Sequence, residues 1–396
     1  YRAVFNDEAT GPKRYVADLS TAYPYDATAM PVYAAKVRDA AERRAMVDVA
    51  NRLILDSQDE SKQVGDIKGA AVESLLLTRS GTHQLSALAG DILNDGLEAE
   101  ILAYLDDPSF IAGARTGVPL FDKVLGGLEK GRVYTILADT SIGKSFFTHW
   151  MARQVTLHGH SPLIFSTEMP KREVVSRLAF MEGQLDRLQV RFNGASTPEE
   201  RGRMRDGMAT IKEKRKIAVS YAANMDITTM ASEIRRRQMT SGVDVVMADH
   251  IQGLRAEGIS MAKEREMLNS VTAGIKQIAG DLDVPVLQMS HIHRPGDETS
   301  MIRPTLRQAH GSGSIERDSD AVLSIYPVAI TTRADGSWLV SDFPSRASFL
   351  AQQRTGKVAM EIMVQKSRAG GSARAIYWLD YSKGGLWIPQ DERNLG

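Results

Sequence analysis

A glycine, a lysine and a serine follow one another at Gly143, Lys144 and Ser145, where an apolar run ends and a helix-like pattern begins. In the order strand, loop, helix, these residue types can bind phosphate. Backbone N–H groups surround the anion, the lysine contacts the β- and γ-phosphates, and the serine hydroxyl binds Mg²⁺. The candidate nucleotide-binding residues are Ala138, Asp139, Thr140, Ser141, Ile142, Gly143, Lys144, Ser145 and Phe146.

The first position of this loop departs from the usual G-x-x-x-x-G-K-[ST] pattern, because Ala138 stands where glycine is expected. We expect the methyl group to be tolerated, since Ala138 lies where the strand turns into the loop. A chance Gly-Lys-Ser at a helix start is the alternative. With the first glycine relaxed, it arises about once in five to ten chains of this length at average composition.

Three further polar residues, Glu168, Asp249 and His291, each stand at the end of a short apolar run. An acid beside a phosphate loop can hold magnesium through water, and a second carboxylate can orient and deprotonate the attacking water. A polar side chain near the γ-phosphate can respond to its loss. Each residue also has an ordinary structural explanation. Glu168 would be a glutamate in the first turn of a helix, Asp249 an aspartate that caps a turn at a strand end, and His291 a polar residue at a strand exit.

The elements that must position these residues are short apolar runs bounded by turns and separated by helical stretches. They occupy residues 133–138, 161–167, 216–223, 243–249, 284–290, 320–327 and 357–366, and a second strand-like run follows the turn at 365–371. Continuous apolar strands that alternate with helices indicate an α/β fold with a mostly parallel sheet covered on both faces. Ligands of such sheets bind at the carboxyl ends of the strands.

The chain before residue 117 shows helical periodicity and no strand pattern. The predicted helices cover residues 32–55, 64–79 and 83–105. A glycine-rich segment at residues 111–131 precedes the first strand, so we place the boundary of the α/β part there.

Composition limits the classes of function. The chain has 396 residues, with 49 basic and 49 acidic side chains and a formal net charge of zero, which argues against a polycation that coats nucleic acid. A local basic groove or binding by backbone N–H groups stays open. Because the chain has no cysteine, disulfides, Cys-ligated zinc and iron–sulfur clusters are excluded, and a cytoplasmic setting fits. No apolar run approaches the roughly 20 residues that span a bilayer, so no membrane partner is expected.

Six stretches resemble, in this order, the DnaB-type replicative helicases of bacteria and their phages. They are TGVPLFDKVLGGLEKGRVYTILADTSIGKS, PLIFSTEMP, VVMADHIQGL, QMSHIHR, GSGSIERDSDAVLSIY and VQKSRAGG. The resemblance implies a RecA-like P-loop ATPase core in a homohexameric ring, with ATP and Mg²⁺ bound between subunits. It also implies 5′–3′ translocation on single-stranded DNA, unwinding of forked duplex DNA, and a helicase loader and a primase as partners. The location would be the cytoplasm, or the host cytoplasm for a phage protein.

The same resemblance divides the chain. Residues 32–53 resemble the end of the family's N-terminal helical domain, and residues 66–79 resemble its linker helix, which docks on the neighbouring subunit. We therefore expect a partial helical N-terminal domain at residues 1–60, a linker helix region at 61–112 and a RecA-like ATPase domain at 113–396.

The motifs carry roles onto single residues. By resemblance, Lys144 and Ser145 bind phosphate and Mg²⁺, Glu168 is the catalytic carboxylate, Asp249 is the magnesium-side acid and His291 is the γ-phosphate sensor. At His291 DnaB proteins usually have Gln and some phage relatives have His, whereas His250 stands where the family usually has Tyr.

Two basic residues and two loops are assigned to other partners by the same resemblance. Lys366 and Arg368 match the finger that reaches the neighbouring subunit's ATP, where an arginine can contribute roughly 10³–10⁵ in rate. The candidate DNA-binding residues are His310, Gly311, Ser312, Gly313, Lys263 and Arg265. The family commonly has Arg and Glu at the first two of these positions, so this chain favours phosphate contacts through backbone N–H groups, which carry no sequence information. For Lys263 and Arg265, a solvated helix start is an equal alternative.

Two other classes of protein share part of this pattern. A RecA-like ATPase that does not unwind DNA, either a recombinase or a clock-type ATPase, would have the same phosphate loop and carboxylates. A catalytically silent ring or DNA-binding scaffold is disfavoured by the intact Lys144, Ser145, Glu168, Asp249 and Arg368. The helical linker and the GSGSIERDSD stretch favour the helicase.

Overall fold

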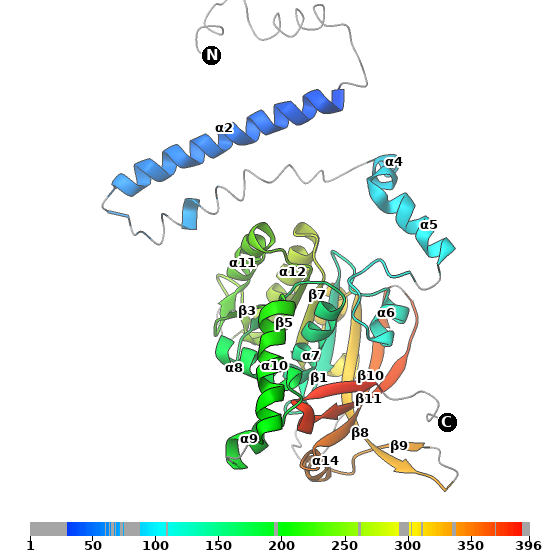
Figure 1. Cartoon of the computed structure of the whole chain (residues 1–396). Helices are drawn as coiled ribbons and strands as arrows, with labels where there is room; N and C mark the ends of the chain where they lie inside the picture. The colour runs from blue at the N-terminus through cyan, green and yellow to red at the C-terminus, as the bar shows by residue number, and fades with distance from the viewer. Residues whose placement is uncertain are drawn as a thin grey trace, which may run out of the picture. The chain divides into compact units, whose positions relative to one another are not determined.

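The computed structural model of the chain divides into two compact units, residues 1–88 and 89–396 (Figure 1). It describes residues 30–59, 61, 62, 64, 67, 69–71, 74, 88–107, 110–193, 197–259, 263–292, 301, 303–309, 312–334, 338–368 and 370–389. In the described part, every helix is too short or too polar to cross a lipid bilayer.

Among its described residues, the first unit contains the long helix α2 (Met30–Gln58), which confirms the helix predicted at residues 32–55. The helix predicted at residues 64–79 lies mostly outside the described residues.

The second unit begins with a helix that the sequence predicts as continuous over residues 83–105. Residues 83–87 lie outside the described part, and the remainder is helical but interrupted: α4 (Ala89–Ile92) and α5 (Glu98–Asp106) flank a π-helical turn at Leu93–Leu97. Gly96 in this turn has a φ of 105°, a value that residues with a Cβ rarely adopt. The glycine therefore accommodates the break in α-helical geometry.

A large sheet forms the centre of the second unit, and its described strands follow the order β12-β11-β10-β8-β1-β7-β5-β2-β3, with β9 paired to β8. The strands from β8 to β3 run parallel. All seven predicted apolar runs are strands: β1 (Val133–Ala138), β2 (Pro162–Ser166), β3 (Ala218–Tyr221), β5 (Val245–Asp249), β7 (Val286–His291), β8 (Ala321–Thr332) and β10 (Lys357–Ser367). The predicted mostly parallel α/β fold is thus confirmed.

The last strands of the chain form an antiparallel part at one side of the sheet. There β10 pairs with β8 and with β11 (Arg374–Asp380), the predicted second run, and β11 pairs with β12 (Leu386–Pro389). Strand β8 continues to Thr332, beyond its predicted end, because it forms a hairpin with β9 (Trp338–Asp342). Figure 1 shows this hairpin extending past the neighbouring strands. Two short strands, β4 (Met225–Asp226) and β6 (Leu254–Arg255), form a separate small sheet.

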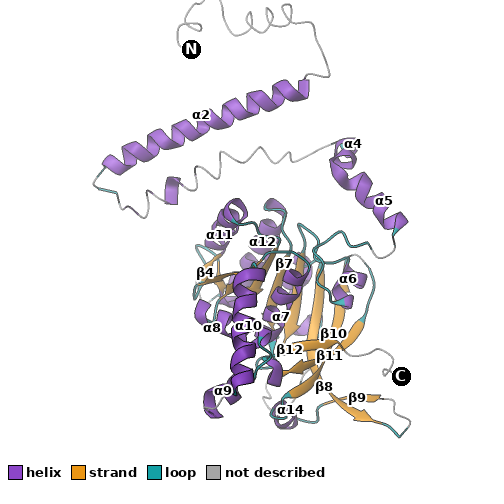
Figure 2. Cartoon of the chain, in the orientation of Figure 1, coloured by secondary structure: helices purple, strands orange, loops and turns teal. Residues whose placement is uncertain are grey.

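Helices cover both faces of the large sheet (Figure 2). The described helices of the second unit after α5 are α6 (Pro119–Leu125), α7 (Lys144–Leu157), α8 (Lys171–Glu182), α9 (Arg187–Asn193), α10 (Pro198–Lys214), α11 (Ile227–Thr240), α12 (Glu264–Asp281), α13 (Ser312–Asp318) and α14 (Arg346–Gln353), with short 3₁₀ turns at Ile251–Gly253, Leu306–Gln308 and Tyr381–Lys383. Alternate side chains of β1 enter different cores: Tyr134 and Ile136 pack with α7 and α8, whereas Val133 and Leu137 pack with α11 and α12. This two-sided burial explains why β1 reads as a continuous apolar run.

Helix α7, which follows the phosphate loop, is fixed by aromatic packing. The ring centroids of Phe147 and Trp387 lie 5.1 Å apart, and those of Trp150 and Tyr377 lie 5.8 Å apart. All four side chains are almost completely buried. Aromatic pairs at these separations add to the hydrophobic burial, so α7 is held against the C-terminal strands.

His149 on α7 is fully buried, and neither of its ring nitrogens has a hydrogen-bond partner among the described residues. Burial lowers the pKa of His149 to about 3. Between pH 6.5, the ordinary pKa of histidine, and about pH 3, the unfolded chain binds a proton at His149 that the folded chain does not bind. The free energy of unfolding therefore decreases as the pH falls through this range.

Acidification from pH 6.5 to about pH 5 is expected to cost about 2 kcal/mol of unfolding free energy through His149 alone, at about 1.4 kcal/mol per pH unit. Urea unfolding at several pH values measures this. A His149→Leu variant should lose that part of the pH dependence, whereas the exposed His158→Leu control should keep it. Parallel pH profiles for wild type and His149→Leu would contradict the prediction.

Candidate nucleotide-binding site

The phosphate loop connects the end of β1 to the start of α7. Two of its residues have positive φ values, Ser141 at 63° and Gly143 at 104°, and Gly143 is the N-terminal cap of α7. A Cβ on Gly143 would lie 2.7 Å from Cδ2 of Leu379. Both the backbone conformation and the available space therefore require glycine at this position.

Ala138, in contrast, has no need to be glycine. It is the last residue of β1, pairs with Ile325 and His291 on the neighbouring strands, and buries its methyl group in the core cluster that contains Phe147. Its φ value is not positive. The departure from the usual loop pattern is thus accommodated by ordinary strand geometry.

Lys144 lies inside the loop. Its Nζ donates hydrogen bonds to the carbonyl oxygens of Asp139 at 2.5 Å and Ala138 at 3.3 Å, and lies 3.0 Å from Nδ1 of His291. The side chain is buried, so the loop carbonyls compensate its charge. A bound phosphate would offer the ammonium group a stronger, charged acceptor.

Ser145 and Asp249 form the arrangement expected of a magnesium site. The Ser145 hydroxyl is hydrogen-bonded to the Asp249 carboxylate at the end of β5. Burial raises the pKa of Asp249 to about 6, although the Ser145 hydrogen bond and the charge of Lys144 oppose this shift. A hydroxyl and a carboxylate are the oxygen ligands that Mg²⁺ prefers, and a bound cation would replace the solvent that Asp249 lacks. The residues therefore fit the ion.

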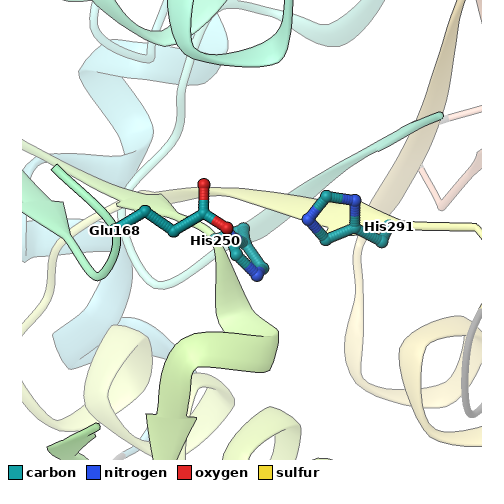
Figure 3. Close-up of side chains that lie close together, drawn as sticks. All are labelled: Glu168, His250 and His291. Atoms are coloured by element: carbon teal, nitrogen blue, oxygen red, sulfur yellow. The ribbon is translucent and has the colours of Figure 1, made fainter. Parts of the chain in front are cut away.

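Glu168 follows β2 at the same edge of the sheet. The preceding residue, Thr167, donates its backbone N–H to the carbonyl of Asp249 at 3.0 Å. Gly253 makes this approach possible, because a Cβ there would lie 2.2 Å from Oγ1 of Thr167. The Glu168 side chain is 66% exposed, and its Oε1 lies 3.6 Å from Nδ1 of His250 (Figure 3). Because Glu168 precedes Pro170, the N-terminal cap of α8, it is not in the helix first turn.

His250 and His291 face each other across the site. Their rings meet edge to face with centroids 4.2 Å apart (Figure 3). Burial lowers the pKa of His250, and the nearby Glu168 carboxylate opposes the shift. The backbone N–H of His291 donates to Oε1 of Gln252 at 3.3 Å, and Nε2 of Gln252 donates to Oγ of Ser290 at 2.9 Å. Gln252 is not among the residues predicted from the sequence, where its signal is its place just after the Asp249 strand.

The sheet order explains how these residues come together. Strands β1, β7, β5 and β2 are consecutive neighbours, and they carry Ala138, His291, Asp249 and Glu168 at or just after their carboxyl ends. This is the edge at which open parallel sheets bind ligands. The structure therefore brings together the predicted loop, acids and sensor, which lie far apart in the sequence.

Beside the loop, a cavity of 530 Å³ offers space for the base and ribose of a nucleotide. It is lined by Phe146, Arg177, Phe180, Asp186, Arg187, Gln353, Arg354, Gly356, Tyr381 and Gly384. The rings of Phe146 and Tyr381 meet edge to face at 5.5 Å, and the guanidinium of Arg177 lies 5.4 Å from the Phe146 ring. Aromatic faces and guanidinium planes are the groups on which bases stack. Of these residues, only Phe146 is among those predicted from the sequence.

Arg346, at the start of α14, also contacts the loop. Its guanidinium donates to Oδ2 of Asp139 at 3.4 Å and to the carbonyl of Thr140 at 3.3 Å. An arginine more than 200 residues away in the sequence thus links α14 to the phosphate loop.

Replacing Arg346 by glutamine should raise the KM for ATP about two- to tenfold with little change in kcat. A part-buried ion pair of this length contributes about 0.5–1.5 kcal/mol, and here it orders the loop in both ground and transition states. Steady-state ATP turnover measures this, with Arg333→Gln on an exposed turn as the control. A fall in kcat at unchanged KM would show that Arg346 acts on the reaction itself.

Lys366 and Arg368 do not join this site within one chain. Ser367 pairs with Ala321 at the start of β8, whereas Ala138 pairs with Ile325, four residues further along β8. At about 3.3 Å per residue this is roughly 13 Å along the strand. The phosphate loop lies at the carboxyl ends of the parallel strands, whereas the two basic residues lie at the opposite, amino ends.

These two side chains instead bind the end of α13. Lys366 Nζ donates to the carbonyls of Glu316 and Ser319, and burial lowers its pKa. Arg368 donates to the carbonyl of Arg317 at 2.7 Å and to Oδ1 of Asp320 at 3.2 Å, with 48% of its side chain exposed. Cations commonly satisfy the free carbonyls of a helix C-terminus.

The DNA-binding candidates are only partly placed. His310 and Gly311 lie outside the described residues, as does the side chain of Ser312, whereas Gly313 is exposed in the first turn of α13. Lys263 and Arg265 are exposed at the start of α12, where Lys263 pairs with Glu266 at 2.9 Å. Their assignment to DNA stays a prediction.

The sheet, the phosphate loop and the surrounding carboxylates define the class of protein as a P-loop ATPase with a RecA-like core. The model of the DnaB-like helicase C-terminal domain matches residues 113–380. The chain therefore belongs to the DnaB-like helicase family, whose members are ATP-dependent DNA helicases.

Named relatives agree with this family. The chain is 26% identical to the replicative DNA helicase DnaB of Haemophilus influenzae over 81% of this chain and 69% of that protein. It is 23% identical to the replicative DNA helicase DnaB of Geobacillus stearothermophilus over 95% of this chain and 79% of that protein.

Solved structures share the fold. A DnaB-like replicative helicase, described with its interactions with primase, aligns with a TM-score of 0.61 and 18% identity over 95% of this chain and 83% of that chain. A second solved structure, an isolated ATPase domain, aligns with a TM-score of 0.60 and 19% identity over 76% of this chain and 99% of that chain. At these identities the likeness concerns the fold alone.

Proposed function

We propose that the protein is the motor of a replicative helicase: a homohexameric ring that hydrolyses Mg²⁺–ATP between subunits, moves 5′–3′ on single-stranded DNA and unwinds forked duplex DNA. Lys144 and Ser145 bind the phosphates and magnesium, Asp249 holds the magnesium, and Glu168 activates water. His291 contacts the γ-phosphate. The proposed place of action is the cytoplasm, with a loader and a primase as partners.

The position of two basic residues supports assembly of several subunits. The basic pair Lys366 and Arg368 lies at the sheet edge opposite the phosphate loop of its own chain. A site in which Lys366 and Arg368 also contact the γ-phosphate, in addition to Lys144 of the loop, therefore requires a second copy of the chain. Head-to-tail contacts of this kind form a ring when the rotation between neighbouring subunits closes, and an open filament when it does not.

A second observation supports contact between copies. Helices α4 and α5 and the turn between them expose many large apolar side chains in the single chain. They are Ile92, Leu93, Leu97, Ile101, Leu102 and Leu105, and Leu105 is 75% exposed. Apolar surface of this extent on one short segment favours an interface with another subunit. The proposed domain division keeps this segment in the linker region, residues 61–112, between the partial helical domain at 1–60 and the ATPase domain at 113–396.

The connection from DNA to ATP is proposed to run through α13. Its first residues are Ser312 and Gly313, DNA-binding candidates, and the carbonyls at its last turn hold Lys366 and Arg368. A DNA strand that shifts α13 would also move the basic pair that serves the next subunit.

The test is ATP turnover by the purified chain with and without single-stranded DNA, together with its mass in solution. We expect DNA to stimulate turnover and the mass to be that of a hexamer. DNA-independent turnover by a monomer would contradict the ring motor and favour a RecA-like ATPase that does not unwind DNA.

A further inference from the structure

Three side chains that can ligate a metal converge beside the phosphate loop (Figure 3). They are Glu168, His250 and His291, which follow or end the neighbouring strands β2, β5 and β7. One ligand atom of each lies within 4.8 Å of the others. The set contains one carboxylate and two imidazoles, which differs from the all-oxygen set at Ser145 and Asp249.

We propose that Glu168, His250 and His291 bind a divalent transition-metal ion of the zinc class, and that the bound ion inhibits ATP turnover. Imidazole nitrogen and carboxylate oxygen bind Zn²⁺ at about 2.0–2.2 Å, and three protein ligands leave a fourth position for water. Magnesium prefers oxygen ligands, so the two neighbouring sites select different ions.

The spacing needs only small movements to close around an ion. Nδ1 of His250 and Oε1 of Glu168 are 3.6 Å apart, close to the roughly 3.4 Å between two ligands at tetrahedral angles around zinc. His250 is buried and positioned by the end of β5, whereas the Glu168 side chain is mostly exposed and can turn toward the ion. His291 has its backbone fixed by Gln252, so two of the three ligands are preorganised.

One neighbouring charge opposes the ion. Nζ of Lys144 lies 3.0 Å from Nδ1 of His291 and repels a second cation there. The buried Asp249 carboxylate attracts a cation at the site. It lies close enough to Glu168 for the two carboxylates to interact electrostatically. Removal of the Lys144 ammonium should therefore tighten the metal site, although the same change removes the group that binds phosphate.

Inhibition follows from the ligands themselves and is the one part of this inference that rests on the proposed function. A Glu168 oxygen bonded to a metal cannot accept a proton from the attacking water. A His291 held by the same ion cannot contact the γ-phosphate. The ion would thus occupy the two side chains that complete the site around ATP.

The experiment measures binding first and turnover second. Zn²⁺ is titrated into the nucleotide-free wild-type chain by calorimetry, and Co²⁺ replaces it to report ligand geometry by its visible absorption. We expect about one ion per chain and a tetrahedral Co²⁺ spectrum. His250→Phe, His291→Gln and Glu168→Gln should each weaken binding at least about tenfold, since even partners outside the ligand shell contribute that much. The exposed His158→Ala should bind like wild type.

Lys144→Ala separates this inference from the proposed function, because we expect it to lose ATP turnover but to bind Zn²⁺ more tightly than wild type. Equal Zn²⁺ affinity in wild type and all three ligand variants, or no binding, would overturn the site even if the helicase activity is found. Binding at the trio with unchanged ATP turnover at saturating Zn²⁺ would overturn the inhibition.

Discussion

Mixing Arg368→Ala subunits with Lys144→Ala subunits is expected to restore ATP turnover that neither variant shows alone. In the proposed ring, Lys144 acts on ATP in its own subunit, whereas Arg368 acts on ATP in the next subunit. A mixed ring therefore contains some interfaces in which both residues are intact. Few other arrangements allow two dead variants to complement each other.

The expected size of the effect can be estimated. Arg368→Ala alone should lower turnover by roughly 10³-fold or more, the range of an arginine that stabilises transition-state charge. In randomly mixed rings at equal amounts, about one quarter of the head-to-tail interfaces pair an intact Lys144 with an intact Arg368. Turnover should thus recover to about one quarter of wild type if the sites act independently, and to less if they must act in sequence.

The controls decide between this geometry and its alternatives. Energy transfer between labelled subunits shows whether mixed rings form, and Arg374→Ala, a nearby exposed cation on β11, should keep turnover when assayed alone. If mixed rings form and no ratio of the two variants restores turnover, Arg368 does not serve the neighbouring site. Its role would then be the one seen in the single chain, where it binds Asp320 and the end of α13.

Strands and strand-end residues follow from local sequence patterns, whereas contacts between distant residues do not. The apolar runs that became β1, β5 and β7 are visible in sequence because burial on both faces favours apolar side chains at most positions. Polar residues that interrupt such runs at their ends, such as Asp249 and His291, are equally visible. Parallel topology then brings them to one edge, so the candidate site was largely predictable.

Other parts of the site depend on contacts that no local pattern records. Arg346 reaches Asp139 across more than 200 residues, from a helix that follows the unpredicted β8–β9 hairpin. Tyr381 lines the 530 Å³ cavity beside the phosphate loop from a short turn after β11. Their residue types are common on protein surfaces, and only the packing of α14 and the C-terminal strands against α7 brings them to the loop.

Glu168→Gln is expected to lower kcat for ATP hydrolysis by roughly 10²–10⁴-fold while nucleotide binding stays within a few-fold of wild type. The amide has the shape of the carboxylate but cannot accept the proton of the attacking water. Glu168 contacts neither the loop carbonyls nor Ser145 among the described interactions, so the phosphate and magnesium groups should stay in place. Single-turnover hydrolysis and fluorescent-nucleotide binding measure the two quantities separately.

Substitution of Asp249 is expected to affect nucleotide binding as well as turnover, unlike substitution of Glu168. Asp249→Asn removes the charge hydrogen-bonded to Ser145, so it should weaken Mg²⁺-dependent nucleotide binding as well as turnover. The exposed Glu199→Gln on α10 controls for the loss of one carboxylate elsewhere. If Glu168→Gln weakened binding as Asp249→Asn does, both acids would belong to the magnesium site. If its turnover stayed near wild type, the water must be activated by another group, and His250, whose Nδ1 lies 3.6 Å from Oε1 of Glu168, is a candidate base.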